Sequence, residues 1–502
     1  MRKHPTALAC ALFLALSLTG LFSSRAAADS LQAVERPNVV ILMTDDQTLR
    51  SMRALPMTRA LIGAAGATFA NAFVNNPRCC PSRATFLTGQ YSHNHGVLTN
   101  GPPGGGWWGL RGIRNWLPTW LRDAGYRTVH IGKFLNGYGR DDPLEIPAGW
   151  DEWYATVDPT TYRYFGATMN ENGVLRSASG QYATDVTARR ATEVVERLAP
   201  SANPFFLSVA FLAPHTGTPR EPGDPIGLGT PAVPARHAGR FATARLPLAA
   251  AFNEADVSDK PAGLRRPPLA LQTVAAIEHL YRQRLESLLA VDEAVVSITD
   301  ALRAAGELER TLIVFTSDNG YMTGEHRLAH GKAQVYDPAV RVPLLVRGPG
   351  IPPGVRPRQL ATNADLAPTI LDAAGVAPGR PQDGRSLLPL ARDSRSGRGR
   401  ALLIEVWRGT RLRSSAVRTP RWLYAEHRRS GRELYDMARD PEQLQSLHSA
   451  PSHAAVRAAL ASTLRALRDC RGRTCREPSQ SCLVLSGRTR AANAWRNRSK
   501  PC

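Results

Sequence analysis

Residues 36–46 read Arg-Pro-Asn-Val-Val-Ile-Leu-Met-Thr-Asp-Asp: a proline, then a β-branched and apolar run, then two aspartates. A run this short and this apolar predicts a strand buried on both faces of a sheet. Similar runs follow at 126–131, 205–212, 311–316 and 342–346. Helical patterns lie between them, the clearest at 281–302. Strands that alternate with helices predict an α/β domain with a largely parallel sheet.

Polar side chains follow the ends of these predicted strands. They are Asp45, Asp46, Lys133, His215, Asp318 and Asn319. In open parallel sheets, the residues just beyond the carboxyl ends of the strands meet at one edge and form the binding site. The convergence of polar residues at four strand ends therefore predicts a single active site.

Two of these strand ends carry pairs of oxygen-bearing side chains, Asp45-Asp46 and Asp318-Asn319. Either pair alone is typical of a turn or a helix cap. Two pairs at equivalent strand ends favour a pocket of hard oxygen ligands, which suits calcium and, as the alternative, magnesium.

Several basic residues are candidate ligands for an oxyanion: Arg83, Lys133, Lys332 and His215. A metal ion together with fixed cations suits a tetrahedral, multiply charged group such as sulfate or phosphate. The alternatives are solvated surface charges for Arg83, Lys133 and Lys332, and an ordinary loop residue for His215.

The segment 79–89 reads Cys-Cys-Pro-Ser-Arg-Ala-Thr-Phe-Leu-Thr-Gly. Residues 84–87 with Gly89 predict a short helix and its stop, so Cys79 is expected just ahead of a helix N-terminus, where the positive field favours a thiolate. The pattern Cys79-x-Pro-Ser-Arg83 resembles the signature of the type I sulfatases. In that family a separate maturing enzyme oxidises the first cysteine to formylglycine. The resemblance implies that Cys79 is the modified residue and Cys80 is a neighbour without a role.

The resemblance covers nearly the whole chain and extends to the segments 36–47, 315–326, 341–346, 365–371 and 433–441. It implies that Asp45, Asp46, Asp318 and Asn319 hold calcium together with the hydrated formylglycine at Cys79. It further implies that Arg83 steadies the hydrate, that Lys133 and Lys332 grip the sulfate, and that His215 lies near the leaving oxygen. One hydroxyl of the hydrate would attack sulfur, and the other would then release sulfate.

One segment departs from the pattern of many arylsulfatases. They carry Gly-Lys-Trp-His after the fourth strand, and that histidine is the base for sulfate release. Here residues 132–138 read Gly-Lys-Phe-Leu-Asn-Gly-Tyr, so the base is unassigned and Asn136 is a candidate for hydrogen bonding. This variant resembles the N-acetylglucosamine-6-sulfatase branch. His93 and His95 are expected either to line the substrate cleft or to be structural, and His130 is expected to be structural.

The N-terminus predicts export. A basic start, an apolar run at 7–22 and small residues up to Ala28 are typical of a signal peptide over 1–28. We therefore expect a secreted, periplasmic or extracellular protein with no membrane anchor after signal removal; a retained anchor is the alternative. In such a compartment Cys470, Cys475, Cys482 and Cys502 predict two disulfides rather than a zinc site. Cys470–Cys475 with Cys482–Cys502 is the simplest of three pairings.

The chain of 502 residues has a formal charge of +21, which attracts sulfated polysaccharides, acidic cell walls or nucleic acid. No nucleic-acid-binding motif occurs, so we expect no nucleic acid partner. A basic secreted protein without a polyanion partner is the alternative. A segment rich in proline, glycine and arginine at 379–400 predicts a boundary between a catalytic domain, 29–385, and a small C-terminal domain, 400–502.

The resemblance implies an alkaline-phosphatase-like sheet flanked by helices, followed by a smaller α+β domain. It implies hydrolysis of sulfate esters, with a sulfated sugar or an aryl sulfate as substrate and the formylglycine-generating enzyme as maturation partner. Two alternatives stay open. One is a phosphonate monoester or phosphodiester hydrolase with the same formylglycine, and the other is a non-catalytic polyanion-binding relative.

Overall fold

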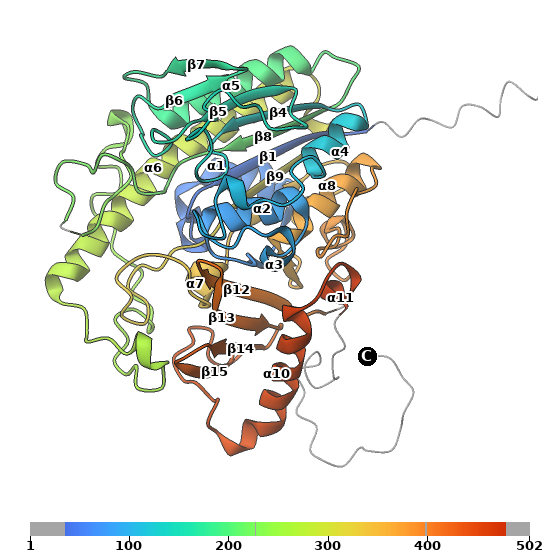
Figure 1. The fold of residues 1–502 in the computed structure, drawn as a ribbon. Helices are drawn as coiled ribbons and strands as arrows, with labels where there is room; N and C mark the ends of the chain where they lie inside the picture. The colour runs from blue at the N-terminus through green and yellow to red at the C-terminus, as the bar shows by residue number, and fades with distance from the viewer. Residues whose placement is uncertain (1–35, 226, 397–398, 478–502) are drawn as a thin grey trace, which may run out of the picture. The chain divides into compact units, whose positions relative to one another are not determined.

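The computed structural model describes residues 36–225, 227–396 and 399–477. Its main sheet has the strand order β2-β10-β9-β1-β8-β4-β5-β6-β7 (Figure 1). The strands are β1 Asn38–Thr44, β2 Ala67–Thr68, β4 Arg127–Gly132, β5 Glu152–Thr156, β6 Thr168–Glu171, β7 Val174–Ser177, β8 Phe205–Ala210, β9 Thr311–Ser317 and β10 Leu344–Arg347. All five strands predicted from apolar runs are present.

The central strands β9, β1, β8, β4 and β5 are parallel to one another. The pairs at both edges, β2–β10–β9 and β5–β6–β7, are antiparallel. The prediction of a largely parallel sheet is therefore confirmed for its centre. At one edge a tight turn joins β6 to β7, and such a turn can only join antiparallel strands. At the other edge β2 pairs with β10, which is remote from it in the sequence.

Side chains of β1 alternate between two apolar cores. Val39, Ile41 and Met43 pack in one core with residues of the helices α2 (Cys79–Thr88), α4 (Leu117–Asp123) and α8 (Leu366–Ala374). Val40 and Leu42 pack in the other with residues of α5 (Ala183–Leu198) and α6 (Leu271–Ala304). Burial on both faces explains why the run is continuously apolar rather than alternating.

The helices are α1 Pro56–Thr58, α2 Cys79–Thr88, α3 Ser92–His95, α4 Leu117–Asp123, α5 Ala183–Leu198, α6 Leu271–Ala304, α7 Asp337–Val340, α8 Leu366–Ala374, α9 Leu388–Arg392, α10 Ala454–Arg468 and α11 Arg473–Arg476. Among the described helices, none combines the length and the hydrophobicity needed to cross a membrane.

Helix α2 corrects one prediction. It begins at Cys79 itself rather than at Ala84, and it ends at Gly89, which has a left-handed backbone (φ +67°). Pro81 does not delay the start, because the first N–H groups of a helix have no partner within it and proline therefore costs no hydrogen bond there. Cys79 is the first residue of the helix and not a residue ahead of it.

The C-terminal part forms an antiparallel sheet, β12 Leu402–Arg408, β13 Arg411–Arg418, β14 Trp422–His427 and β15 Gly431–Asp436, covered on one face by α10. Side chains of its other face, such as Ile404 and Ala416, belong to the same apolar core as α2. A separate short pair joins β3 Asn71–Phe73 with β11 Leu360–Thr362. The domain limits 29–385 and 400–502 stay a prediction.

The predicted Cys470–Cys475 disulfide is present, with an S–S distance of 1.99 Å. The predicted Cys482–Cys502 pair and the predicted signal peptide lie outside the described residues. Cys79 and Cys80 are both buried free thiols.

Candidate active site

The predicted metal ligands follow two adjacent parallel strands. In β1 and β9, Thr44 lies opposite Ser317, so the residues that come next stand side by side. The backbone N–H of Asp46 donates to Asp318 Oδ1 at 3.1 Å, and Asn319 Nδ2 donates to Asp46 Oδ1 at 2.6 Å. Segments far apart in the sequence thus bring four oxygen-bearing side chains into one buried cluster, as predicted.

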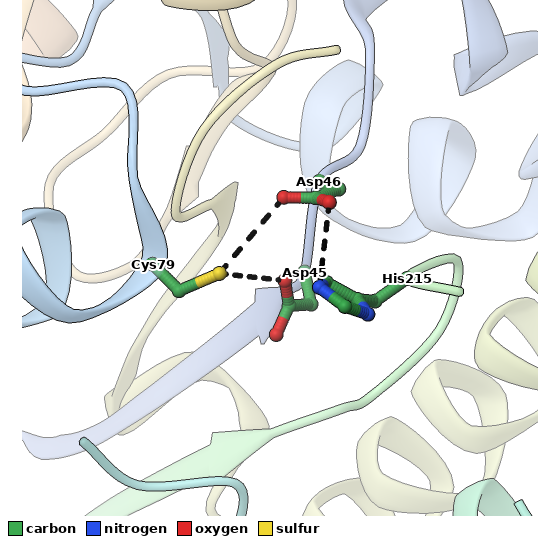
Figure 2. Close-up of side chains that lie close together, drawn as sticks. All are labelled: Asp45, Asp46, Cys79 and His215. Carbon is green, nitrogen blue, oxygen red and sulfur yellow. Dashed lines mark hydrogen bonds and ion pairs between the residues drawn. The ribbon is translucent and has the colours of Figure 1, made fainter. Parts of the chain in front are cut away.

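Cys79 points from the first turn of α2 toward this cluster (Figure 2). Its Sγ lies 3.3 Å from Asp45 Oδ1 and 4.0 Å from Asp46 Oδ1. Lys332 Nζ lies 2.8 Å from the same sulfur and forms an ion pair with Asp46. The residue at position 79 therefore lies between carboxylates and an ammonium group, at the positive end of a helix.

Arg83, one turn further along α2, connects three elements of the site. Its Nε donates to Asp318 Oδ2 at 2.8 Å, and its Nη2 donates to Asp45 Oδ2 at 3.2 Å. Its Nη1 donates to the carbonyl of Lys133 at 2.7 Å. The ammonium of Lys133 forms an ion pair with Asp45. Both basic side chains are almost fully buried, so these pairs fix the position of Asp45.

The oxygen cluster fits a hard divalent cation. The side-chain oxygen of Asn319 is buried and has no hydrogen-bond partner, although the amide nitrogen of the same side chain has two. Ligand atoms of Asp45, Asp46, Cys79 and His215 lie within 4.8 Å of one another. Buried carboxylates and an unpartnered amide oxygen are the donors that calcium and magnesium prefer.

The environment of the site shifts the pKa values of Cys79 and Asp45 in opposite directions. Burial raises the pKa of the Cys79 thiol, and Asp45 raises it further. Burial alone would also raise the pKa of Asp45, but Lys133, His215 and Arg83 reverse this and hold the pKa below its usual range. A thiol with a raised pKa is a poor nucleophile, which disfavours an unmodified Cys79 as the reacting group.

His215 reaches the site from the loop that follows β8. Its Nε2 lies 3.6 Å from Asp46 Oδ2, and its Nδ1 lies 2.7 Å from the carbonyl of Thr216. Because a carbonyl only accepts, Nδ1 carries a proton and Nε2 faces the cluster. Burial lowers the pKa of His215 to about 4, although Asp45 and Asp46 oppose the shift.

Two residues of the site were not predicted. The ring of Tyr162 lies 4.5 Å from Lys133 Nζ and 4.8 Å from the ring of His215, and Asn136 Nδ2 donates to its hydroxyl at 2.5 Å. Arg284, on α6, donates to the carbonyls of Asp46 and Pro214. Tyr162 lies in an irregular loop without a sequence signal, whereas Arg284 is a charge within an apolar helical stripe.

The other histidines considered in the sequence make structural contacts. His95 is fully buried and bonds Thr85 Oγ1 at 3.0 Å. His93 bonds Glu405 and the carbonyl of Cys470. His130 stacks on Trp153, with ring centroids 4.8 Å apart. These contacts agree with the structural interpretation of each histidine.

Comparisons with known proteins identify the family of this chain. A model of the sulfatase family matches residues 37–376, and a model of the N-sulphoglucosamine sulphohydrolase C-terminal region matches residues 324–470. An arylsulfatase of Volvox carteri is 35% identical over 93% of this chain and 79% of its own length. The N-acetylglucosamine-6-sulfatase of Homo sapiens is 38% identical over 71% of this chain, and the match spans 64% of that relative.

Solved structures share the fold. A protein in complex with its substrate D-glucosamine-2-N,6-O-disulfate has a TM-score of 0.72 and 23% identity, and the match covers 88% of this chain and 99% of that one. The phosphonate monoester hydrolase of Agrobacterium radiobacter has a TM-score of 0.62 and 24% identity, with coverage of 86% and 95%. The predicted alkaline-phosphatase-like fold with a smaller C-terminal sheet is confirmed. Because the family model matches most of the chain, this protein belongs to the type I sulfatase family and is a sulfuric ester hydrolase.

Proposed function

We propose that this chain is a secreted sulfatase that hydrolyses sulfate esters of sulfated sugars through a formylglycine made from Cys79. The observation that carries the proposal is the position of Cys79, at the first turn of α2 and within reach of Asp45, Asp46 and Lys332. When formed, the hydrated aldehyde supplies one hydroxyl that attacks sulfur and a second that releases sulfate.

The surrounding side chains have the charges that this chemistry needs. Lys332 contacts Cys79 and pairs with Asp46, and Lys133 pairs with Asp45. Both would bind the sulfate oxygens and stabilise charge on them. Arg83 would hold the carboxylates and the modified residue in place. His215 would lie near the leaving oxygen and, in its imidazolium form, which carries a proton on both ring nitrogens, would give that oxygen the proton of Nε2. Asn136 and Tyr162, which bond each other beside Lys133, are the candidates for ordering the release step.

Asp45, Asp46, Asp318 and Asn319 would hold a calcium ion, with magnesium as the alternative. The unpartnered oxygen of Asn319 and the three buried carboxylates support this assignment. The ion would neutralise the carboxylates and draw negative oxygen atoms of the substrate toward position 79.

Names of relatives support a sugar substrate. One is an N-acetylglucosamine-6-sulfatase, and others are extracellular sulfatase homologues of Caenorhabditis elegans and Drosophila melanogaster. The formal charge of +21 favours binding to a polyanionic sugar chain. The extracellular relatives and the predicted signal peptide over residues 1–28 together support secretion.

Mass spectrometry of the peptide that contains residue 79 tests the modification. The secreted protein, made in a host with the formylglycine-generating enzyme, is expected to carry an aldehyde at Cys79 and a thiol at Cys80. The matched variants are Cys79→Ala and Cys80→Ala, since both cysteines are fully buried neighbours in α2. Cys79→Ala should abolish sulfatase activity, and Cys80→Ala should retain it. An active protein with an unmodified thiol at position 79 would exclude the proposed nucleophile.

A second candidate is hydrolysis of phosphonate monoesters or phosphodiesters, favoured by the fold shared with the phosphonate monoester hydrolase. Comparing kcat/KM for N-acetylglucosamine 6-sulfate, an aryl sulfate, a phosphodiester and a phosphonate ester separates the two. Sulfate esters should be the best substrates. If they are much the poorest, the second candidate replaces the first. Binding without turnover of any ester would favour the non-catalytic polyanion-binding alternative.

A further inference from the structure

The C-terminal sheet carries an open cavity rich in arginine, beside the last residue of α10. Its volume is about 320 Å³, which lies within the range of sites that bind small ligands. Among the described residues that line it, the one acidic side chain is that of Glu426. The basic side chains of this arginine cavity are those of Arg413, Arg428, Arg432 and Arg468. The excess of positive charge suits an anionic ligand.

The arginine cavity begins where α10 stops covering the sheet. Val417 and Tyr424 pack with α10 in one apolar core. Side chains alternate along a strand, so Ser415 and Glu426 follow them on the same face. Arg468, at the end of α10, donates to Ser415 Oγ and to Glu426 Oε2, each at 2.6 Å. The arginines of β13, β15 and the turn after β14 lie beyond this contact and are exposed.

Two of these arginines are neighbours of like charge. Arg413 stands opposite Arg428 across β13 and β14, one step beyond the pair of Ser414 with His427. The backbone N–H of Arg428 donates to the carbonyl of Arg413 at 2.9 Å. Side chains at opposite positions of an antiparallel pair lie about 5 Å apart at Cβ, and like charges there repel each other. An oxyanion bound by both guanidinium groups would replace this repulsion by attraction.

Glu426 does not neutralise this pair. Its Oε2 lies 2.6 Å from Arg468 Nη2, and its Oε1 lies 3.9 Å from Arg432 Nε. Within the part of the chain that the structure describes, Arg413 and Arg428 have no acidic partner. Their guanidinium groups are therefore the donors that an external ligand would meet. A planar guanidinium binds sulfate and carboxylate through paired hydrogen bonds.

The arginine cavity lies at the end of the sheet that contacts a loop of the active site. The turn between β12 and β13 packs on loop 99–106, where a Cβ added to Gly104 would lie 3.0 Å from Thr410 Cγ2. Asn100 Oδ1, in the same loop, accepts a hydrogen bond from the backbone N–H of Cys80 at 3.1 Å. The turn between β14 and β15 is at the same end, because consecutive strands run in opposite directions. One loop therefore contacts both the first turn of α2 and this end of the sheet.

We propose that the arginine cavity is a second anion site, which binds sulfate or carboxylate groups of a sugar chain away from the ester that reacts. The proposal rests on the proposed function, because it takes the ligand to be the sulfated sugar chain that the active site cleaves. None of the described lining residues is a phenylalanine, tyrosine or tryptophan on which a nucleic acid base would stack. The site would raise the affinity for long chains over single sugars, since two linked groups bind together.

Direct binding tests the site. The probe is a fluorescent heparin oligosaccharide, which carries both sulfate and carboxylate groups, and its Kd is measured by fluorescence anisotropy at about 0.15 M salt. All proteins carry Cys79→Ala, so that the proposed reaction does not consume the probe. Arg413→Gln and Arg428→Gln should each raise the Kd about tenfold, because each removes a charge-assisted contact with the ligand.

Arg439→Gln is the matched control. Arg439 is an exposed arginine that follows β15 at the opposite end of the sheet, so its replacement removes the same charge from the same part of the chain. It should change the Kd less than about twofold. An equal rise in Arg439→Gln, or no rise in Arg413→Gln and Arg428→Gln, would overturn the site. If single-stranded DNA of similar charge binds as tightly and loses as much affinity, the sugar chain is the wrong ligand.

Thermal unfolding gives a second readout and shows whether the variants fold. Arg413→Gln removes one of two charges that repel each other, so it should not lower the Tm. The oligosaccharide should raise the Tm less in Arg413→Gln than in the parent protein, and an equal rise would refute the site. Binding does not depend on turnover. A protein that cleaves sulfate esters but shows an unchanged Kd refutes the cavity alone, and one that cleaves none but shows the tenfold difference refutes the proposed function alone.

Discussion

Arg284→Met tests whether Arg284 holds in place the end of β1 that carries the proposed metal ligands. The Arg284 side chain is buried, donates to the carbonyl of Pro214 at 3.0 Å and to that of Asp46, and lies 4.5 Å from the centre of the Tyr321 ring. Asp46 has a left-handed backbone (φ +64°), an uncommon conformation that needs such support. Methionine fills much of the space but donates no hydrogen bond.

The expected loss of stability follows from the carbonyl groups and the aromatic ring that the substitution leaves without a partner. Each buried carbonyl without a donor costs about 1–3 kcal/mol, and the lost contact with the Tyr321 ring costs about 1 kcal/mol. Removal of a buried charge offsets part of this. We expect Arg284→Met to lower the free energy of unfolding by about 3 kcal/mol. We also expect kcat/KM to fall at least about 100-fold, because Asp46 and the loop of His215 lose their common anchor.

Arg282→Met is the matched control, on the same helix. Arg282 also donates to a carbonyl, that of Ala244 at 2.9 Å, but it is partly exposed and its other partner is Glu278. Its loss should cost about 1 kcal/mol and leave kcat/KM unchanged. Urea denaturation and sulfatase assays on both variants measure the two effects. If Arg284→Met and Arg282→Met behave alike in stability and in activity, the anchoring role is refuted.

Other predictions concern the metal, the disulfide and one histidine. Removing the proposed calcium ion with a chelator should lower the Tm of the wild type by roughly 3 °C, reversibly, and Asn319→Leu should show little of this shift. Replacing Cys470 and Cys475 by serine opens a loop with a sequence separation of 5 and should cost about 2 kcal/mol, measured as a lower Tm. Burial lowers the pKa of His93, but Glu405 more than reverses this and raises it from 6.5 to about 9. The charged pair therefore stabilises the fold fully below pH 6.5 and is lost as the pH rises through 9. His93→Gln should flatten the fall in Tm between these pH values, and an unchanged slope would contradict the assignment.

Much of the site could be predicted from the sequence because its residues follow strand ends. The apolar runs that end at Asp45 and Asp318 are unambiguous, and parallel strands bring their carboxyl ends to one edge. Pairing of Thr44 with Ser317 then sets the two acidic pairs side by side. The apolar runs do not show that β1 and β9 are neighbours in the sheet, and they do not show the register in which the two strands pair. Both depend on the order in which strands enter the sheet.

Other features could not be predicted because they depend on how remote segments pack. Helix α2 starts at Cys79 and not at Ala84, because proline at position 81 is tolerated in the first turn of a helix. Tyr162 reaches Lys133 from a loop with no periodicity. The C-terminal sheet shares an apolar core with α2, which no local pattern indicates.

Arg284 could be predicted in part: the sequence indicates a buried charge but does not indicate which groups bind it. Its neighbours on the helix face, Tyr281, Leu285 and Leu288, are buried, so the pattern places a permanent charge inside the protein. Buried charges require partners, and the pattern therefore predicts that a partner exists. It cannot say that the partners are two backbone carbonyls, because carbonyls occur at every residue and leave no mark in the sequence. Where an apolar stripe contains an arginine without an acidic residue one turn away, the structure must supply the acceptors. Here they belong to the loops that carry Asp46 and His215.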